Sequence, residues 1–326
     1  MTLEPPSSSE LATSPYQSER VLVSYHSQRS GPAFLAVGSL HGNEPAGRLA
    51  IERVATQLHA AREQEGFGLL CGDFLGLAGN LSALEMRMRY VDTDLNRGWS
   101  RERLDRLASQ GPQSVEDREM LELHRAIEKF RTEAHGDLHF LDLHTTSGDS
   151  PPFASVVNRK IDRELVSALP VPTVLGIDTH LEGTFLECMQ QAGFAGVVYE
   201  GGQHDDPIAV DQCEAAIWLI LEKLAMISVY QGKILENRIA WAHACLDPIG
   251  RRYPELLQIE SRFALERATD FVMEPGYRSF QPVRKGDLLA HHRDEEVRSD
   301  RDGMILMPLY QPQGDEGFFL MSEIGG

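Results

Sequence analysis

The sequence has few cysteines and no long apolar run. Its 326 residues include only four cysteines, Cys71, Cys188, Cys213 and Cys245, with no CxxC pair. This scatter argues against a disulfide framework or a cysteine zinc site and favours a reducing compartment, so we expect a cytoplasmic protein. The most apolar stretch, Ala215 to Leu221, is far shorter than the roughly 20 residues that cross a bilayer, so no membrane partner is expected.

Positive charge is also scarce. Lysine and arginine number 31 against 49 aspartates and glutamates, a formal net charge of −18. A chain this acidic repels phosphate and anionic lipid, so nucleic acid is not an expected partner and an anionic ligand would need local arginines. The first ten residues, MTLEPPSSSE, lack the basic start and apolar core of an export signal. Residues 1–19 are rich in proline, serine and glutamate, which predicts an unstructured leader.

Short apolar runs alternate with amphipathic stretches from Val21 onward. The runs predicted as strands are Ala33–Leu40, Phe67–Leu77, Leu138–Leu143 and Gly196–Tyr199. The stretches predicted as helices are Ala46–Gln64, Gln113–Glu133 and Pro207–Val229. Strands that alternate with helices indicate an α/β fold, with a mostly parallel mixed sheet sandwiched by helices over residues 20–235.

The pattern changes after about residue 235. From Phe271 onward the sequence is strand-like and is interrupted by turn residues, for example at Glu274-Pro275-Gly276 and at Asp302-Gly303. We therefore expect residues 236–326 to form a small β-rich C-terminal domain, which could cover the active-site crevice.

Three polar motifs stand at the carboxyl ends of predicted strands: His41 to Glu44, Asp142 to His144, and Glu200 with the two glycines after it. Ligands of open α/β sheets bind outside these strand ends. The recurrence predicts one shared site.

Two histidines and one glutamate in these motifs suit a metal ion. His41 and Glu44 are three residues apart across a turn that contains glycine, and His144 would add a third donor from another strand. Two histidines and a carboxylate, with the fourth position left to water, are typical of catalytic zinc. An isolated HxxE pattern is more often a helix-start glutamate beside a surface histidine, but the second histidine at the end of a buried strand favours the metal site.

Two further carboxylates accompany these ligands. Asp142 shares a strand face with His144, so it could hold the ring N–H of that histidine; the alternative is a buried aspartate that caps a turn. Glu200 ends an apolar run and could take a proton from water and pass it to a leaving amine. Its alternative is a surface glutamate that opens a turn.

A separate segment supplies arginines. Asn96 and Arg97 are adjacent, and Arg89 precedes them by eight positions. An amide beside a guanidinium suits a substrate carboxylate, and a separate arginine could stabilise charge on a scissile carbonyl oxygen. Alone, two loop arginines would usually be solvated surface.

Together these motifs resemble the succinylglutamate desuccinylase/aspartoacylase family, which are zinc amidohydrolases related to the zinc carboxypeptidases. The segments that carry the resemblance are Gly38 to Glu44, Gly79-Asn80 with Ala83-Leu84, Arg89-Tyr90 with Asp94 to Arg97, Asp142 to Thr145, Gly183 to Phe185, and Phe280 to Gly286. The resemblance covers most of the chain.

This resemblance implies one zinc ion per chain on His41, Glu44 and His144, with Glu200 as general acid and base. It further implies that Arg89 polarises the scissile carbonyl and that Asn96 and Arg97 hold the substrate carboxylate. One branch of the family adds a C-terminal tyrosine near the substrate, for which Tyr310 is a guess, because the segment from Tyr310 to Phe319 does not align cleanly.

The expected activity is zinc-dependent hydrolysis of a small anionic N-acyl amino acid, similar to N-succinylglutamate or N-acetylaspartate, to a carboxylic acid and a free amino acid. Two enzymatic alternatives stay open: deacetylation of another amino or diamino acid, and a zinc carboxypeptidase that acts on peptides. A binding protein that kept the fold is a third, and a homo-oligomer is compatible with the sequence.

Overall fold

The computed structural model describes residues 19–27, 29–65, 70–157, 159–177, 179–227, 233–266 and 268–324. The leader predicted over residues 1–19 therefore lies outside the described residues except for Glu19. The helices are α1 (Ala46–Glu65), α2 (Leu81–Met86), α3 (Arg101–Gln110), α4 (Val115–Glu133), α5 (Lys160–Val166), α6 (Phe185–Gln191), α7 (Ile208–Lys223) and α8 (Lys233–Gly250), with a 3-10 turn η1 at Ala268–Asp270.

The strands of the first two thirds of the chain are β1 (Val21–His26), β2 (Ala33–Gly38), β3 (Asp73–Ala78), β4 (Leu138–Thr146), β5 (Phe153–Val156), β6 (Thr173–Leu175) and β7 (Ala195–Gln203). The remaining strands are β8 (Leu256–Ala264), β9 (Phe271–Met273), β10 (Gln281–Val283), β11 (Leu288–His292), β12 (Glu295–Arg298), β13 (Gly303–Leu306) and β14 (Glu316–Glu323).

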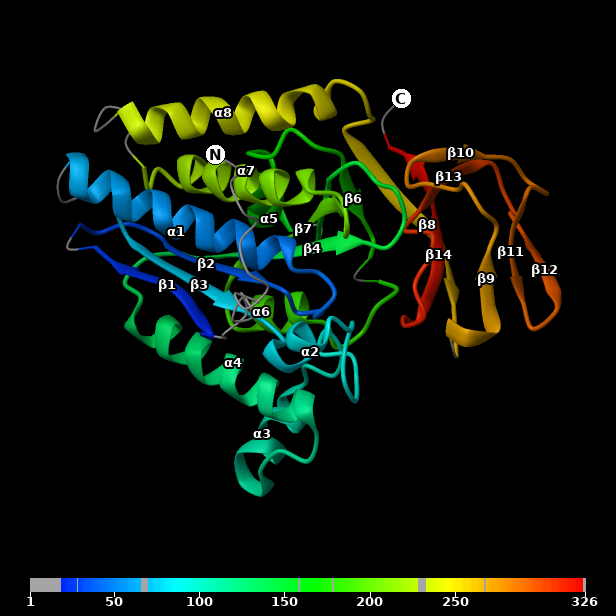
Figure 1. Cartoon of the computed structure of the whole chain (residues 1–326), viewed down its shortest axis with the longest axis horizontal. Helices are drawn as coiled ribbons and strands as arrows, with labels where there is room; N and C mark the ends of the chain where they lie inside the picture. The colour runs from blue at the N-terminus through cyan, green and yellow to red at the C-terminus, as the bar shows by residue number, and fades with distance from the viewer. Residues whose placement is uncertain are drawn as a thin grey trace, which may run out of the picture.

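The predicted α/β sandwich is confirmed. The main sheet has the order β1-β3-β2-β4-β7-β5-β6-β8-β14-β13-β10, and its centre from β3 to β7 is parallel. Every residue of β2 is buried, as expected for a central parallel strand that is covered on both faces. One apolar core joins this sheet to α1, α5, α7 and α8, and a second joins it to α4 and α6 (Figure 1).

Strands β4 and β7 run further than the apolar runs indicated. β4 continues to Thr146 and β7 to Gln203, so His144 and Glu200 lie within strands that were predicted to end beside them. Cross-strand pairing explains the extension, because His144 pairs with Glu200 and Thr146 with Gln203 after a bulge. The backbone hydrogen bonds between β4 and β7 hold these polar residues in strand geometry, although the local sequence has no apolar pattern that predicts a strand there.

Two other predicted elements are shorter than expected. β3 begins at Asp73, after Gly72 turns the chain with a φ of 81°, whereas the predicted strand began at Phe67, which lies outside the described residues. α7 ends at Lys223, although a helix to Val229 was predicted; residue 229 is likewise not described. Ala225 turns the chain with a φ of 52°, and Ile227 then pairs with Leu70.

The strand-like character of the C-terminal part is confirmed, and its strands join the main sheet. β8 pairs in parallel with β6, and β14 pairs with β8. β9, β11 and β12 form a separate three-stranded antiparallel sheet at the far end of the molecule (Figure 1). Helix α8 packs on α7, so the chain beyond residue 235 starts with a helix against the first core; the division at residue 235 stays a prediction.

Within the described residues, no helix has the length and apolar character needed to cross a membrane.

Candidate metal and active site

A tight turn after β2 aims His41 and Glu44 at β4. β2 ends at Gly38, Ser39 adopts a φ of 61°, and the Ser39 hydroxyl donates a hydrogen bond to the Glu44 carbonyl at 2.8 Å. Gly42 lies against α2 so closely that a Cβ atom would stand 2.0 Å from the Ala83 carbonyl carbon. Only glycine fits this packing, and the packing holds the turn in place.

The three predicted metal ligands come together. His41 Nδ1 lies 2.8 Å from Glu44 Oε1, and His144 Nδ1 lies 3.0 Å from Glu44 Oε2. One ligand atom from each side chain lies within 4.8 Å of the other two, and all three residues are buried. This donor set, two imidazole nitrogens and a carboxylate, fits a divalent ion such as zinc.

The outer nitrogen of each histidine faces a carboxylate. His41 Nε2 lies 3.1 Å from Asp94 Oδ1. His144 Nε2 lies 3.1 Å from Asp142 Oδ2, close enough for an ion pair but without hydrogen-bond geometry. Such partners fix the tautomer of a ligating histidine and leave Nδ1 for the ion. Asp142 lies beside the outer nitrogen of His144, as predicted, while its role in holding that ring stays a prediction. Asp94 lies beside the outer nitrogen of His41 and was missed by sequence analysis.

Mutual charge stabilises this cluster. Burial opposes ionisation of Glu44, but His41 and His144 hold its pKa well below the usual range. Burial likewise opposes a charge on His144, but Asp142 and Glu44 hold the pKa of that imidazole well above its usual value. The buried carboxylates thus favour positive charge between them, as expected of residues that bind a cation.

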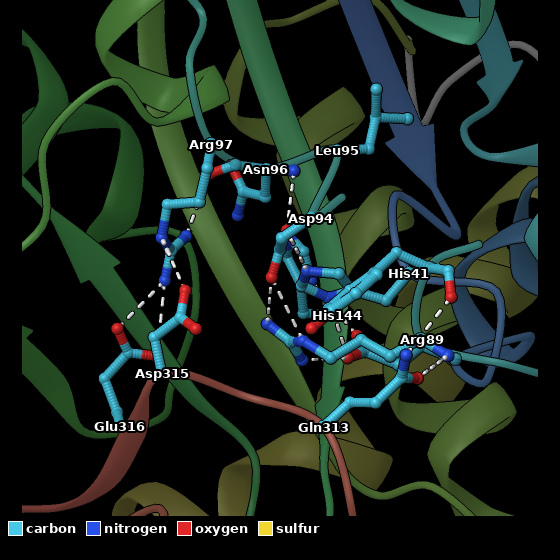
Figure 2. Close-up of polar contacts among 12 residues, drawn as sticks. His41, Arg89, Asp94, Leu95, Asn96, Arg97, His144, Gln313, Asp315 and Glu316 are labelled. Carbon is cyan, nitrogen blue, oxygen red and sulfur yellow. Dashed lines mark hydrogen bonds and ion pairs between the residues drawn. The ribbon is translucent and has the colours of Figure 1, made fainter. Parts of the chain in front are cut away.

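Arg89 lies beside the same cluster. Its Nε donates to Asp94 Oδ2 at 3.1 Å, and its Nη1 lies 3.5 Å from Glu44 Oε1. Figure 2 shows Arg89 and Asp94 packed against His41 and His144. Burial opposes the charge of Arg89, but Asp94, Glu44 and Glu316 raise its pKa further above an already high value, so a fixed cation faces the metal ligands.

Glu200 faces the same space without a partner for one oxygen. It pairs with His144 across β4 and β7, so the two side chains share one face of the sheet. Its Oε2 atom is buried and has no hydrogen-bond partner among the described residues. Burial raises the pKa of Glu200 to about 7. A carboxyl group near neutrality can both accept and release a proton.

Arg97 does not point freely into solvent. Its Nη2 donates to both oxygens of Glu316, at 3.1 and 3.2 Å, and its Nε lies 4.0 Å from Asp315 Oδ2 (Figure 2). Arg262 also donates to Glu316, at 2.9 Å. The guanidinium predicted to hold a substrate carboxylate is thus already paired with a carboxylate of β14.

Asn96 is anchored by its neighbours. The backbone N–H of Asn96 donates to Asp94 Oδ1 at 2.8 Å, and the Asn96 side-chain oxygen accepts from the backbone N–H of Phe185 at 2.9 Å. These contacts fix Asn96, which lines the same cavity as Arg97 and the predicted metal ligands.

Glu116, at the start of α4, positions the arginine segment and was missed by sequence analysis. Its fully buried carboxylate accepts hydrogen bonds from the backbone N–H groups of Val91, Asp92 and Thr93 and from the Asn80 side chain. An acidic first turn of a predicted helix was the available signal, but it does not reveal which loop the side chain reaches.

Two glutamines of the C-terminal part were also missed. Gln311 accepts from the Asn43 side chain at 2.8 Å, and Gln313 accepts from the Arg89 backbone N–H at 3.1 Å. Tyr310, between β13 and β14, points elsewhere: its side chain is 40% exposed and its hydroxyl donates to the Glu274 carbonyl at 2.7 Å. Tyr310 does not line the cavity, whereas its neighbour Gln311 does.

One cavity of about 350 Å³ joins most of the predicted site residues, whereas Asp142 and Tyr310 are not among its lining residues. Its walls include the three metal ligands, Glu200, Arg89, Asn96 and Arg97. Residues of β14 and of the segment before it, such as Gln311 and Glu316, also line it. The predicted site residues other than Asp142 and Tyr310 are therefore neighbours around a single cavity.

Comparison with known proteins agrees with this arrangement. Residues 30–226 match the model of the succinylglutamate desuccinylase/aspartoacylase catalytic domain. A search of curated proteins finds no match to the sequence.

Several solved structures share the fold. A succinylglutamate desuccinylase/aspartoacylase from Rhodobacter sphaeroides is 19% identical with a TM-score of 0.63, and the match covers 91% of this chain and 87% of that one. The product-bound ectoine utilization protein EutE (DoeB) from Ruegeria pomeroyi is 18% identical with a TM-score of 0.63, over 92% and 87%. An aspartoacylase family protein from Mesorhizobium loti is 18% identical with a TM-score of 0.61, over 93% and 88%. At these identities the likeness shows the fold alone. Because the family model spans more than half of the sequence, this chain belongs to the succinylglutamate desuccinylase/aspartoacylase family.

Proposed function

We propose that this protein is a zinc-dependent hydrolase that cleaves the amide bond of a small N-acyl amino acid to a carboxylic acid and a free amino acid. The observation that carries the proposal is the buried cluster of His41, Glu44 and His144 beside Glu200, whose Oε2 has no hydrogen-bond partner in the part of the chain that the structure describes. The family, whose members are desuccinylases and aspartoacylases, supports the same reaction class.

The metal ligands would be His41 Nδ1, the Glu44 carboxylate and His144 Nδ1. A zinc ion held there would supply a Lewis acid and would lower the pKa of a bound water toward about 7. Asp94 and Asp142 orient the two imidazoles from behind. Two histidines and a carboxylate leave one coordination position open, which distinguishes a catalytic site from a structural one.

Glu200 moves the protons in the proposed reaction. Its carboxylate takes a proton from the attacking water, whose oxygen bonds to the acyl carbon. As the C–N bond breaks, Glu200 returns a proton to the departing nitrogen. The guanidinium of Arg89, which is fixed by Asp94, stabilises the negative charge on the carbonyl oxygen.

Asn96 and Arg97 are the proposed carboxylate anchors. The Asn96 side-chain oxygen is used by Phe185, which leaves its NH₂ group as the donor. Arg97 shares Glu316 with Arg262, so Arg262 can keep Glu316 neutralised when a substrate carboxylate approaches Arg97. Tyr310 has no part in this site because its hydroxyl is held by the Glu274 carbonyl.

The C-terminal strands favour a small substrate over a peptide. Leu309, Gln311 and Glu316 line the same cavity as the proposed metal ligands, so the part of the chain after residue 235 contributes to its wall. We propose that residues 20–235 supply the chemistry and residues 236–326 limit substrate size. A carboxypeptidase would need an open groove at this position.

The test is a panel of N-acetyl and N-succinyl amino acids and short peptides, assayed with purified protein whose metal content is measured. We expect acyl amino acid hydrolysis that a chelator abolishes and zinc restores. Cleavage of peptides but not of acyl amino acids would favour the carboxypeptidase. Release of the free amine from an acetylated diamino acid would instead identify a deacetylase of that substrate. Absence of zinc, with no hydrolysis after zinc addition, would favour a binding protein.

A matched pair of variants completes the test. Glu200→Gln removes the proposed proton acceptor, whereas Glu85→Gln makes the same change on the exposed surface of α2. We expect the first to lose hydrolysis and the second to retain it.

A further inference from the structure

The cavity is more apolar and more acidic than a substrate with several carboxylates would require. We propose that the substrate carries one carboxylate and an apolar group, so that the enzyme acts on N-acyl amino acids with an apolar side chain or acyl chain. This inference rests on the proposed function and specifies its substrate class.

An apolar floor begins directly beside the proposed proton acceptor. β5 runs antiparallel to β7, where Phe153 pairs with Glu200 and Ser155 with Val198. Directly paired residues point to the same face, so Phe153 and Val198 continue the face on which Glu200 stands. Phe153 is fully buried and packs edge-on against Phe280, with ring centroids 5.6 Å apart.

The rest of the cavity extends this floor. Ten of the lining residues are apolar, and they come from β5, β7, α6, the segment after β6 and the C-terminal strands. Leu186 of α6, Leu181 before it and Phe319 of β14 are examples from three separate elements. Burying a whole apolar side chain of the substrate against this wall should raise its binding affinity by roughly tenfold to a hundredfold.

Positive charge is scarce on the same walls. Among the described lining residues, the arginines are Arg89 and Arg97, and no lysine is present, whereas five glutamates line the cavity. Arg89 is paired with Asp94, and Arg97 with Glu316. One substrate carboxylate anchored at Arg97 would occupy the remaining positive charge of the cavity besides the metal ion. A second or third substrate carboxylate would therefore meet glutamates.

Glu316 is the residue that we expect to reject extra carboxylates. It lies between Arg97 and Arg262 at the start of β14, with a side chain only 13% exposed. Once a first substrate carboxylate holds Arg97, Glu316 keeps Arg262 as its partner. A second carboxylate would then meet both the first carboxylate and Glu316 at short range, while Arg89, the other arginine of the described lining, is held by Asp94. Glu316→Gln keeps the size of the side chain and removes the charge.

The first experiment compares kcat/KM of the zinc-loaded full chain for N-acetylleucine, N-acetylphenylalanine, N-acetylaspartate and N-succinylglutamate, with N-hexanoylglycine to separate an apolar acyl group from an apolar side chain. We expect at least one apolar substrate to exceed both polyanionic substrates by about tenfold or more. Higher kcat/KM for N-acetylaspartate or N-succinylglutamate would overturn the inference and leave the proposed function intact. No hydrolysis of any substrate would overturn both.

Two variants locate the preference. Leu181→Arg adds a cation to the apolar wall, and Leu181→Met is its control of similar volume. We expect Leu181→Arg and Glu316→Gln each to lower the ratio of kcat/KM for the best apolar substrate over N-acetylaspartate several-fold, while Leu181→Met keeps it. Unchanged ratios in both charge variants would overturn the assignment of this wall.

A binding measurement gives a readout that does not depend on turnover. Titration calorimetry of the zinc-loaded Glu200→Gln protein with N-acetylleucine, N-hexanoylglycine and N-acetylaspartate measures affinity directly. Tighter binding of either apolar ligand is the expected result, and equal or tighter binding of N-acetylaspartate contradicts the proposal.

Discussion

The cavity has two ends that are built in different ways. The metal end consists of His41, Glu44, His144 and Glu200, which lie on or directly after β2, β4 and β7 in the buried parallel centre of the sheet. The substrate end consists of Arg97, Glu316 and the apolar wall around Phe319, where a loop meets β14 from the other end of the chain. At the metal end, strand register places His144 beside Glu200 and the turn after β2 places His41 and Glu44. At the substrate end, the contact between Arg97 and Glu316 joins residues more than two hundred positions apart.

This difference indicates which property each end controls. Parallel strands that are buried on both faces are held by continuous backbone hydrogen bonds and dense packing. The side chains of the metal end therefore stand on a rigid support. The substrate end depends on loops and on edge-side strands, where residues change with little effect on the core. We therefore expect mutations at the metal end to abolish turnover and mutations at the substrate end to change which molecule is turned over.

The largest effect is expected at the metal end. Glu200→Gln should lower kcat by about 10² to 10⁴, because the proton acceptor is lost, while the protein keeps its zinc. His144→Ala should lose both zinc and activity. Steady-state rates and metal content per chain measure the two effects. A near-normal kcat in Glu200→Gln would reject Glu200 as the base.

Asp94→Asn should act indirectly, through the proposed metal ligand His41. It weakens the contacts to His41 Nε2 and Arg89 Nε, both 3.1 Å long, and should reduce zinc affinity by about 10- to 100-fold. Competition with a chelator gives the affinity. Asp92→Asn is the control, because Asp92 is exposed and bonds the Val115 N–H instead. Equal zinc affinities in the two variants would remove Asp94 from the metal site.

The pH dependence of turnover should report Glu200. Burial raises its pKa to about 7, and a bound cation would lower that value, so kcat/KM should rise with pH through an acid limb at or below about 7. The sign follows because only the ionised carboxylate accepts a proton. Below the limb, each pH unit should cost about tenfold. A pH profile in which kcat/KM falls as pH rises through this range would contradict the assignment.

The smallest effect is expected at the substrate end. Arg97→Lys should mainly raise KM, by up to roughly tenfold, because an ammonium cannot reproduce the forked contact of a guanidinium with a carboxylate. KM and kcat measured on the same substrate separate binding from chemistry. An unchanged KM would remove Arg97 from the carboxylate anchor.

Much of the metal end could be predicted from sequence. Buried strands leave apolar runs, and the polar residues that interrupt them at their ends, His41, Glu44, His144 and Glu200, are conspicuous for that reason. The extent of β4 and β7 was not predictable from the sequence. His144 and Glu200 lie in strand geometry because their two strands pair with each other at these positions, and not because the local sequence alternates apolar and polar residues.

By itself, the sequence determined the alternation of strands and helices, the turn that carries His41 and Glu44 and the residue types of the proposed chemistry, because each depends on neighbours within a few positions. Only the tertiary structure decided that Asp94 stands behind His41, that Glu316 pairs with Arg97, that Tyr310 turns away and that an apolar wall adjoins Glu200. These features arise where segments far apart in the chain meet, and local patterns carry no record of which surfaces will face each other.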